Sequence, residues 1–208
     1  MSKIKICGLK RIEDIQYANE LKPDYVGFVF AGTKRKIDYD TAKELRSHLD
    51  DGIKVVGVFV NEKISFISKL ISAKIIDCVQ LHGDEDERYI EELKKTVKAP
   101  IIKAVRVQTE SDIRKAGKLD VDYLLLDAYS KDEYGGSGHG FDKSLIPDDI
   151  DDYFIAGGID RTNIKDIILT YQPYCVDVSS GVETEGFKNK ELMKEVISIV
   201  RNLGGDDE

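Results

Sequence analysis

The sequence predicts an α/β protein that folds as a single-domain (β/α)8 TIM barrel, with eight parallel strands inside a ring of helices. Short apolar runs alternate with longer amphipathic segments along the 208-residue chain, and eight such repeats suit one domain of this length. Most of the apolar runs are nearly continuous, as expected for parallel strands that are covered on both faces. The alternative is an open doubly wound sheet, but the turn "CGLKRIED" after the first run lacks the G-x-G-x-x-G pattern typical of that fold.

Each repeat consists of one strand and the segment that follows it. The predicted strands are residues 4–7, 25–30, 54–60, 77–82, 101–107, 122–128, 153–158 and 174–179. Helical patterns follow seven of them, at residues 11–21, 38–49, 62–73, 84–97, 109–118, 160–171 and 189–203. In the first helical segment Ile12, Ile15 and Ala18 share one face, and the second segment begins with residues that cap helices. This alternation implies parallel pairing through right-handed crossovers.

The repeat after the sixth strand and the end of the chain depart from this pattern. Residues 129–150 are mostly irregular, with at most a short helix near Lys143 to Ile146, so the sixth helix of the barrel is expected to be short or degenerate. The barrel domain is expected to cover residues 1–203. The acidic segment "GGDDE" at 204–208 is expected to be a disordered tail.

The composition argues against several classes of protein. A net charge of −8 and a pI of about 5.1 argue against a nucleic-acid-binding protein. No apolar run reaches the ~18 to 20 residues of a membrane span, and "MSKIKICG" is too short and polar for a signal peptide, so a cytoplasmic protein without a membrane partner is expected. The three cysteines and three histidines show no metal-binding spacing, and neither a metal nor a cofactor is expected.

Two polar residues end predicted strands where a barrel places its active site, at the carboxyl ends of the strands. Cys7 ends the first strand, in "KIKICGLK", and is either a small buried residue or a reactive thiol. Asp127 follows the apolar run "YLLL", and its carboxyl group is costly to bury, so it meets water, caps a helix or acts as a general acid. Cys78 and Cys175 lie early in their strands and are expected to be core residues.

Two segments with glycine and serine, "AGGID" and "DVSSGVE", follow the seventh and eighth strands. The loops at these positions form the recurring phosphate site of TIM barrels, because glycines let backbone amides approach an anion and hydroxyl groups add donors. Ordinary turns use the same residue types. The candidate phosphate-binding residues are Gly157, Gly158, Ser179, Ser180 and Gly181.

Further polar residues follow other predicted strands. Arg35 lies in the basic loop "AGTKRKI", where it either binds a carboxylate or is simply solvated. Asn61 follows the third strand and His82 the fourth. The glycine-rich segment "EYGGSGHGFD" at 133–142 either folds over a ligand or is a slack connection.

Nine short motifs together carry a resemblance to a known family. They are, in chain order, "KICGLK", "VGFVF", "VGVFVN", "VQLHGDE", "IKAVRV", "LLLDAY", "YGGSGHGFD", "AGGI" and "DVSSGVE". In these motifs and their order, over nearly the whole chain, the sequence resembles phosphoribosylanthranilate isomerase, an enzyme family of tryptophan biosynthesis. The resemblance implies an isomerase that converts N-(5-phosphoribosyl)anthranilate, a small phosphorylated substrate, to 1-(2-carboxyphenylamino)-1-deoxyribulose 5-phosphate by an acid/base Amadori rearrangement.

The resemblance also implies a role for each candidate residue. Cys7 corresponds to the general base, Asp127 to the general acid and Arg35 to the arginine that faces the anthranilate carboxylate. Gly158 and Ser179–Gly181 correspond to the phosphate cradle. A thiol with a pKa of ~8.5 needs only a modest downward shift to act as a base near neutrality.

Two departures and two alternatives remain. The chain has Thr33-Lys34-Arg35 where the family often has Ser-Pro-Arg or Ser-Lys-Arg, and Lys143 where an aromatic residue is common. One alternative is a related aldose-ketose isomerase of histidine biosynthesis. That family has an aspartate at each of the two catalytic positions, so the cysteine at position 7 argues against it. The other alternative is a non-catalytic barrel that binds a phosphate ligand. A monomer and a homodimer are both compatible with the sequence.

Overall fold

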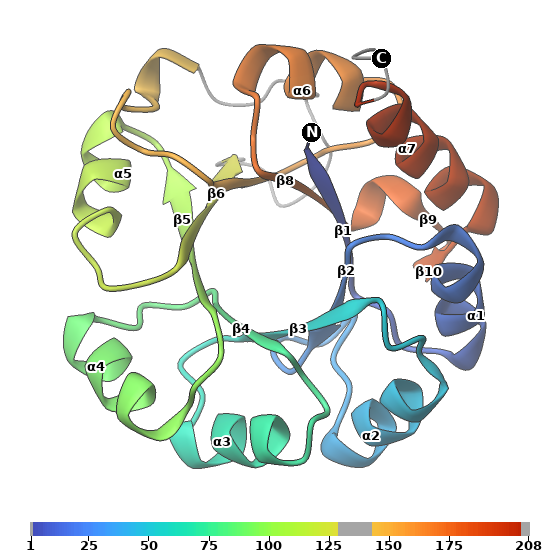
Figure 1. The fold of residues 1–208 in the computed structure, drawn as a ribbon, viewed down its shortest axis with the longest axis horizontal. Helices are drawn as coiled ribbons and strands as arrows, with labels where there is room; N and C mark the ends of the chain where they lie inside the picture. The colour runs from blue at the N-terminus through green and yellow to red at the C-terminus, as the bar shows by residue number, and fades with distance from the viewer. Residues whose placement is uncertain (1, 129–142, 205–208) are drawn as a thin grey trace.

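A closed barrel of eight parallel strands forms the centre of the molecule, in the order β1 to β8. The computed structural model describes residues 2–128 and 143–204. The strands are β1 (Lys3–Cys7), β2 (Tyr25–Val29), β3 (Lys54–Phe59), β4 (Cys78–Leu81), β5 (Ile101–Val107), β6 (Tyr123–Ala128), β7 (Phe154–Ala156) and β8 (Cys175–Val178). The barrel closes where β1 pairs with both β2 and β8, and the helices form a ring outside it (Figure 1).

The helices follow the strands in the predicted alternation. They are α1 (Ile12–Leu21), α2 (Tyr39–His48), α3 (Ile64–Ser72), α4 (Glu87–Thr96), α5 (Glu110–Ala116), α6 (Ile164–Tyr171) and α7 (Lys190–Asn202). A 3-10 turn, η1 (Lys143–Leu145), stands where the sixth helix of the barrel would be. The predicted fold class, with its short sixth helix, is therefore confirmed. Within the described ranges no helix has the length and apolar character needed to cross a membrane.

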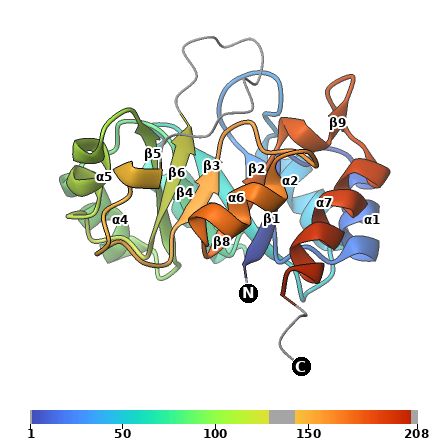
Figure 2. The same ribbon diagram turned by 90° about the horizontal axis from the view of Figure 1, so that it is seen from above.

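One predicted strand ends earlier than expected, and a short turn and a hairpin after β8 were not predicted. The predicted strand 153–158 ends at Ala156, because Gly157 and Gly158 both have positive φ angles and leave the extended conformation. After β8 the chain forms the turn η2 (Ser180–Val182) and a small hairpin of β9 (Glu183–Thr184) and β10 (Phe187–Lys188). Figure 2 places β9 at the edge of the barrel opposite to the start of β1. The predicted tail and the glycine-rich segment 133–142 lie outside the described residues.

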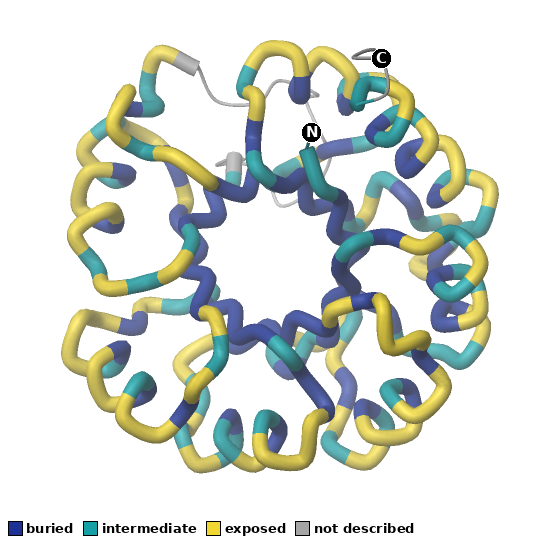
Figure 3. The backbone as a smooth tube through the Cα atoms, in the orientation of Figure 1, coloured by how far each residue is buried: buried dark blue, intermediate teal, exposed yellow. Residues whose placement is uncertain are grey.

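The period of two in each strand separates two apolar layers. In "KIKIC", Ile4 and Ile6 point outward and pack in the layer between the barrel and its helices, so Lys5 and Cys7 point inward. A second, interior cluster lies inside the barrel and comprises Tyr25, Val56, Cys78, Ile102, Ala104, Leu125, Phe154 and Cys175. Figure 3 shows the strands as a buried ring, with helices exposed only on their outer faces. The prediction that Cys78 and Cys175 are core residues is confirmed.

Glycines leave space for neighbouring side chains around the end of β1. A Cβ atom at Gly27 would lie 2.6 Å from the Cys7 sulfur, and a Cβ atom at Gly8 would lie 2.4 Å from Cδ of Arg35. Gly8 also has a φ of +87°, which favours glycine. The chain therefore provides room for the Cys7 thiol and for the Arg35 side chain at the carboxyl end of the barrel.

Candidate active site

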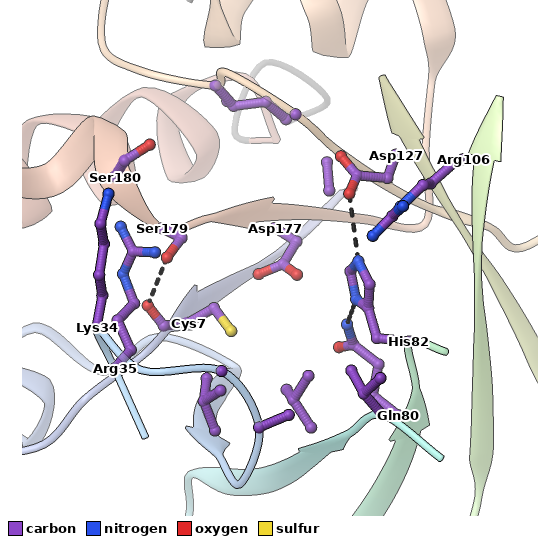
Figure 4. A pocket seen from close by; sticks show the side chains of 18 of the residues that line it. Cys7, Lys34, Arg35, Gln80, His82, Arg106, Asp127, Asp177, Ser179 and Ser180 are labelled. Carbon is purple, nitrogen blue, oxygen red and sulfur yellow. Dashed lines mark hydrogen bonds and ion pairs between the residues drawn. The ribbon is translucent and has the colours of Figure 1, made fainter. Parts of the chain in front are cut away.

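A cavity of about 750 Å³ opens at the carboxyl ends of the strands. The cavity lies directly above the interior apolar cluster. In several strands the next inward-pointing residue after the cluster is polar, as in Cys78 and Gln80 of β4 or Leu125 and Asp127 of β6. Its polar lining residues are Cys7, Thr33, Lys34, Arg35, Gln80, His82, Arg106, Asp127, Asp177, Ser179 and Ser180. Figure 4 shows Cys7, Arg35 and the serines on one side of the cavity and Gln80, His82, Asp127 and Arg106 on the other.

The first side contains what we call the thiol wall, formed by Lys5, Cys7 and Asp177. Lys5 has no exposed surface, and its Nζ atom donates a hydrogen bond to Oδ2 of Asp177 at 2.8 Å. The other carboxylate oxygen, Oδ1, is buried without a hydrogen-bond partner among the described residues. Cys7 is 8% exposed and faces the cavity near Asp177 (Figure 4). The thiol therefore lies in a nearly dry environment with a fixed pair of charges beside it.

Burial has the largest effect on the pKa of this thiol. Burial raises the pKa of the Cys7 thiol above its ordinary value, and the negative charge of Asp177 adds to this effect. The positive charges of Lys5 and Lys188 oppose it. This direction is opposite to the modest downward shift of the pKa that a thiol base needs near neutral pH, because the thiol sits deeper in the barrel than its place at a strand end suggests.

The opposite side contains the carboxyl wall, formed by Gln80, His82 and Asp127. Nε2 of Gln80 lies 2.9 Å from Nδ1 of His82, and because an amide nitrogen donates, Nδ1 accepts this hydrogen bond. The neutral ring then carries its proton on Nε2, which lies 3.3 Å from Oδ2 of Asp127. The side chains of His82 and Asp127 are each 26% exposed. Solvent therefore reaches the carboxyl wall much more readily than the thiol wall.

Arg106 is a second cavity-lining guanidinium group beside the carboxyl wall. It is directly opposite Asp127 in the parallel register of β5 and β6. Its side chain is exposed and forms no hydrogen bond or ion pair with any residue that the structure describes. This arginine can donate hydrogen bonds to an anionic group of a ligand without breaking a hydrogen bond or ion pair to the described residues.

Arg35, in contrast, is already paired. Its Nε and Nη2 atoms each donate a hydrogen bond of 2.7 Å to one carboxylate oxygen of Glu183 in β9. The ammonium group of Lys188 in β10 donates to the same carboxylate at 2.7 Å and to the backbone oxygen of Ser179 at 2.9 Å. Burial opposes ionisation of Glu183, but the hydrogen bonds from Arg35 and Lys188 lower its pKa to about 2. The unpredicted hairpin thus holds Arg35 at the cavity edge.

The candidate phosphate-binding residues come together on this same side. Gly157 and Gly158 have φ angles of +100° and +63°, and both line the cavity with Ser179 and Ser180. The hydroxyl group of Ser179 donates to the backbone oxygen of Cys7 at 3.1 Å, which ties the end of β8 to the end of β1. Gly181 does not line the cavity, but a Cβ atom there would lie 2.0 Å from the backbone oxygen of Ile159. Gly181 therefore allows the loops after β7 and β8 to touch.

The structure gathers the predicted site residues around one cavity, except Gly181 and Asn61. It also adds residues that the sequence analysis did not select: Lys5, Gln80, Arg106, Asp177, Glu183 and Lys188. Side-chain alternation along the strands could have indicated three of them. Lys5, Gln80 and Asp177 each lie two positions before a polar residue at a strand end, and therefore on the same inward face. Asn61 does not line the cavity and instead accepts a hydrogen bond from the Asp84 amide in the next loop.

The described part of the chain contains no group of three or more His, Cys, Asp or Glu side chains placed to hold a metal ion. The Lys143 side chain, at one of the two departures from the family pattern, lies outside the described part of the chain. The other departure is described: Thr33 and Lys34 line the cavity next to Arg35.

Comparison with known proteins decides the family. The family described as "N-(5'phosphoribosyl)anthranilate (PRA) isomerase" matches residues 4–199. The chain belongs to this family. A curated N-(5'-phosphoribosyl)anthranilate isomerase from Endomicrobium trichonymphae is 53% identical over 203 residues, which cover 98% of this chain and 100% of that protein.

Solved structures of PRA isomerases have the same fold. The structure of the enzyme from Thermotoga maritima has a TM-score of 0.87 and 36% sequence identity, and the match covers 97% of this chain and 100% of that one. A second PRA isomerase structure is a complex with reduced 1-(o-carboxyphenylamino)-1-deoxyribulose 5-phosphate. It has a TM-score of 0.81 and 30% identity, and the match covers 97% of this chain and 100% of that one. The recognition made from the nine motifs is confirmed.

Proposed function

We propose that this PRA isomerase family member converts N-(5-phosphoribosyl)anthranilate to 1-(2-carboxyphenylamino)-1-deoxyribulose 5-phosphate in tryptophan biosynthesis. The observation that supports this activity best is the cavity itself, which brings a thiol and a carboxyl group from β1 and β6 to facing walls. An acid and a base are what an aldose-to-ketose rearrangement requires. The complexed relative was solved with a reduced form of the same product, in keeping with this assignment.

Asp127 is the proposed general acid. It would donate its proton to the ring oxygen of the ribose as the bond between C1′ and that oxygen breaks, and the anthranilate nitrogen would supply the electron pair that forms a Schiff base. His82 lies 3.3 Å from the carboxylate and fixes its orientation. Because the carboxyl wall is open to solvent, water can return the proton to Asp127 after each turnover.

Cys7 is the proposed general base. Its thiolate would remove the proton from C2′ of the Schiff base, and the resulting enolamine would tautomerise to the ketone. The dry environment favours this role once the thiolate has formed, since a poorly solvated anion is a stronger base. No oxidation or reduction by an external group is needed, because the rearrangement is internal to the sugar.

The two ends of the substrate would occupy the side of the cavity that carries Arg35. The phosphate group would bind to the backbone amides at Gly158 and at Ser180–Gly181, with the hydroxyl groups of Ser179 and Ser180 nearby and Gly157 shaping the turn. The anthranilate carboxylate would bind to Arg35. Since the Glu183 carboxylate already occupies two of the five N–H donors of Arg35, the substrate must use the N–H groups of Nη1 and the second N–H of Nη2, or displace Glu183.

Turnover tests the activity directly. Purified protein mixed with phosphoribosylanthranilate should consume it, and loss of the fluorescence of the substrate should follow the reaction. A barrel that only binds phosphate ligands would show affinity without product, and a histidine-pathway isomerase would turn over its own aminoimidazole substrate instead. The expectation of a monomer or homodimer is a separate prediction, which light scattering coupled to gel filtration tests.

A further inference from the structure

Lys5 is a fully buried lysine whose presence the proposed reaction does not yet explain. It has no exposed surface, and among the described residues its hydrogen-bond partner in the barrel is Oδ2 of Asp177 at 2.8 Å. Because β1 alternates its side chains, Lys5 and Cys7 point to the same interior face, and the ammonium group interacts with the thiol. The cation thus lies between the apolar interior cluster and the cavity.

Stability alone does not account for this arrangement. Removing two charges from water costs several kcal/mol per ion, and replacing a buried ion pair with apolar residues of similar size is often neutral or stabilising. The pair is also incompletely satisfied, since Oδ1 of Asp177 is buried without a partner in the described part of the chain. An ammonium group has three donors, whereas the Asp177 carboxylate takes one of them. The remaining donors are available to the thiol.

We propose that Lys5 is a positioning residue whose ammonium group favours the thiolate form of Cys7, the charge state in which a thiol can take a proton. The reaction step for which this matters rests on the proposed function. The geometry that carries the inference is the shared interior face of β1 and the enclosure of Lys5 beneath the cavity.

Four charged groups face the thiol, and they come from four segments of the chain. Lys5 of β1 and Lys188 of β10 favour the thiolate, and Asp177 of β8 disfavours it. Arg35, in the loop after β2, interacts with the thiol as a further cation. Each of these cations is paired with a carboxylate, Lys5 with Asp177 and the other two with Glu183. Lys5 differs from them because it shares the interior face of β1 with the thiol, and its effect on the thiol is larger than that of Lys188.

The proton balance is simple. When the thiol ionises, its proton leaves to solvent through the cavity, and the thiol wall then holds two negative charges and one positive charge. When the thiolate takes the C2′ proton it becomes a thiol again, and Lys5 stays protonated throughout. Burial opposes the charge of Lys5, but Asp177 and the thiol together raise the pKa of its ammonium group above its ordinary value. Lys5 is therefore a fixed charge and not a proton carrier.

The test measures the pKa of the thiol without turnover. The rate of Cys7 alkylation by iodoacetamide is followed against pH by peptide mass spectrometry, which separates Cys7 from the buried Cys78 and Cys175. Lys5→Met removes the charge and keeps the length of the side chain. Lys5→Gln removes the charge but keeps a hydrogen-bond donor for Asp177, so it serves if the first variant folds poorly. Lys188→Met is the matched control, a second buried lysine near the thiol.

Both Lys5 variants should raise the pKa of Cys7 by about one unit or more, which slows alkylation about tenfold at a pH below that pKa. Lys188→Met should change the rate less. Alkylation rates equal to wild type in the Lys5 variants, or a larger effect in Lys188→Met, would overturn the proposal. In the wild-type protein the ¹³Cε signal of Lys5 should also titrate with the thiol and lose that inflection in Cys7→Ser, and no inflection in wild type would count against it equally.

The outcome also separates this inference from the proposed function. If the Lys5 variants shift the pKa of Cys7 but Cys7→Ala keeps full turnover, Lys5 tunes the thiol and the thiol is not the base. If Cys7→Ala is inactive and the Lys5 variants alkylate like wild type, the base assignment stands and the role of Lys5 falls.

Discussion

The two walls of the cavity differ in solvent exposure, although both are built from inward-pointing residues at alternate positions of a strand. On the thiol wall, Cys7 is 8% exposed and the residue two positions before it, Lys5, is fully buried. On the carboxyl wall, Asp127 and His82 are each 26% exposed, and the residue two positions before His82 is the amide Gln80. On the thiol wall, the residue that lies beside the reactive group is the charged Lys5. On the carboxyl wall, it is the neutral Gln80, whose hydrogen bond orients His82.

The difference in solvent exposure suits the proposed proton transfer on each wall. A base that removes a proton from carbon benefits from a poorly solvated anion, and keeping that anion charged in a dry site needs a fixed cation. An acid that protonates a ring oxygen must be recharged, and contact with water allows this. The walls therefore differ in solvent access because their proposed tasks differ, and the predictions below are ordered by how strongly each would break that division.

Loss of the thiol should have the largest effect. Cys7→Ala removes the proposed base from a site that water barely reaches, so kcat should fall by roughly 10²- to 10⁴-fold with the fold unchanged. Steady-state kinetics and circular dichroism check this. The controls Cys78→Ala and Cys175→Ala lie in the interior cluster, and they should lower the melting temperature more than kcat. Near-wild-type turnover in Cys7→Ala would remove the thiol wall from the mechanism.

Loss of the acid should come next, with a smaller effect because the carboxyl wall is open to water. Asp127→Asn keeps the shape of the side chain and its contact with His82 but cannot donate an acidic proton, so kcat should fall by about 10²- to 10³-fold while KM changes little. Full activity of this variant from low to high pH would place the acid elsewhere.

The two ends of the substrate should respond to different changes. Arg35→Ala removes a charge-assisted contact worth ~1.5 to 3 kcal/mol, so KM should rise roughly ten- to a hundredfold. Arg106→Ala, at the other guanidinium of the cavity, should change KM less, and an analogue without the carboxylate should be indifferent to Arg35→Ala. A larger increase in KM in Arg106→Ala would instead assign the anthranilate carboxylate to Arg106, beside the carboxyl wall.

Gly158→Val should weaken the phosphate end specifically. A side chain at Gly158 points into open space at the cavity, where it would block the approach of an anion to the backbone. The Ki of inorganic phosphate should therefore rise in this variant. Gly186→Val is a matched control, since Gly186 also has a positive φ and open space around its Cβ position but lies in the turn between β9 and β10, outside the cavity lining. Equal changes in Ki in both variants, or a shift in Arg35→Ala as large as in Gly158→Val, would contradict the two-ended arrangement.

The smallest effect concerns stability at low pH. The folded-state pKa of Glu183 is lowered from 4.5 to about 2, so its ion pairs stabilise the fold above pH 4.5 and lose that contribution as the pH falls towards 2. Glu183→Gln should therefore lower the melting temperature near neutral pH, and the difference from wild type should vanish near pH 2. A constant difference across this range would mean that the hairpin gains nothing from the charge of Glu183.

The fold and the strand-end residues could be predicted because both follow from local patterns. The β-then-α alternation fixes the barrel, and the barrel fixes where Cys7, Asp127 and Ser179 meet. The alternation within β1 also implies that Lys5 points into the barrel, although lysine side chains are usually exposed. Partners that lie far apart in the chain could not be predicted in this way.

The thiol wall and the Arg35 contact are such cases. Lys5 and Asp177 are 172 residues apart, and Arg35 and Glu183 are 148 apart, so each pair depends on closure of the barrel. The hairpin that presents Glu183 consists of two strands of two residues each, too short to give a periodic signal. The direction of the Cys7 pKa shift depends on the depth of the thiol in the closed barrel, which a single strand does not reveal.

The division of labour between the walls is tested most directly by the kinetic isotope effect on kcat with a substrate deuterated at C2′. In Cys7→Ser, the serine hydroxyl group is hardly ionised near neutral pH, so removal of the C2′ proton becomes the slow step and a large primary isotope effect is expected. In Asp127→Asn, ring opening becomes slow before that proton moves, and the isotope effect should fall close to one. An isotope effect that is large in Asp127→Asn and near one in Cys7→Ser would contradict the assignment of base and acid to these walls.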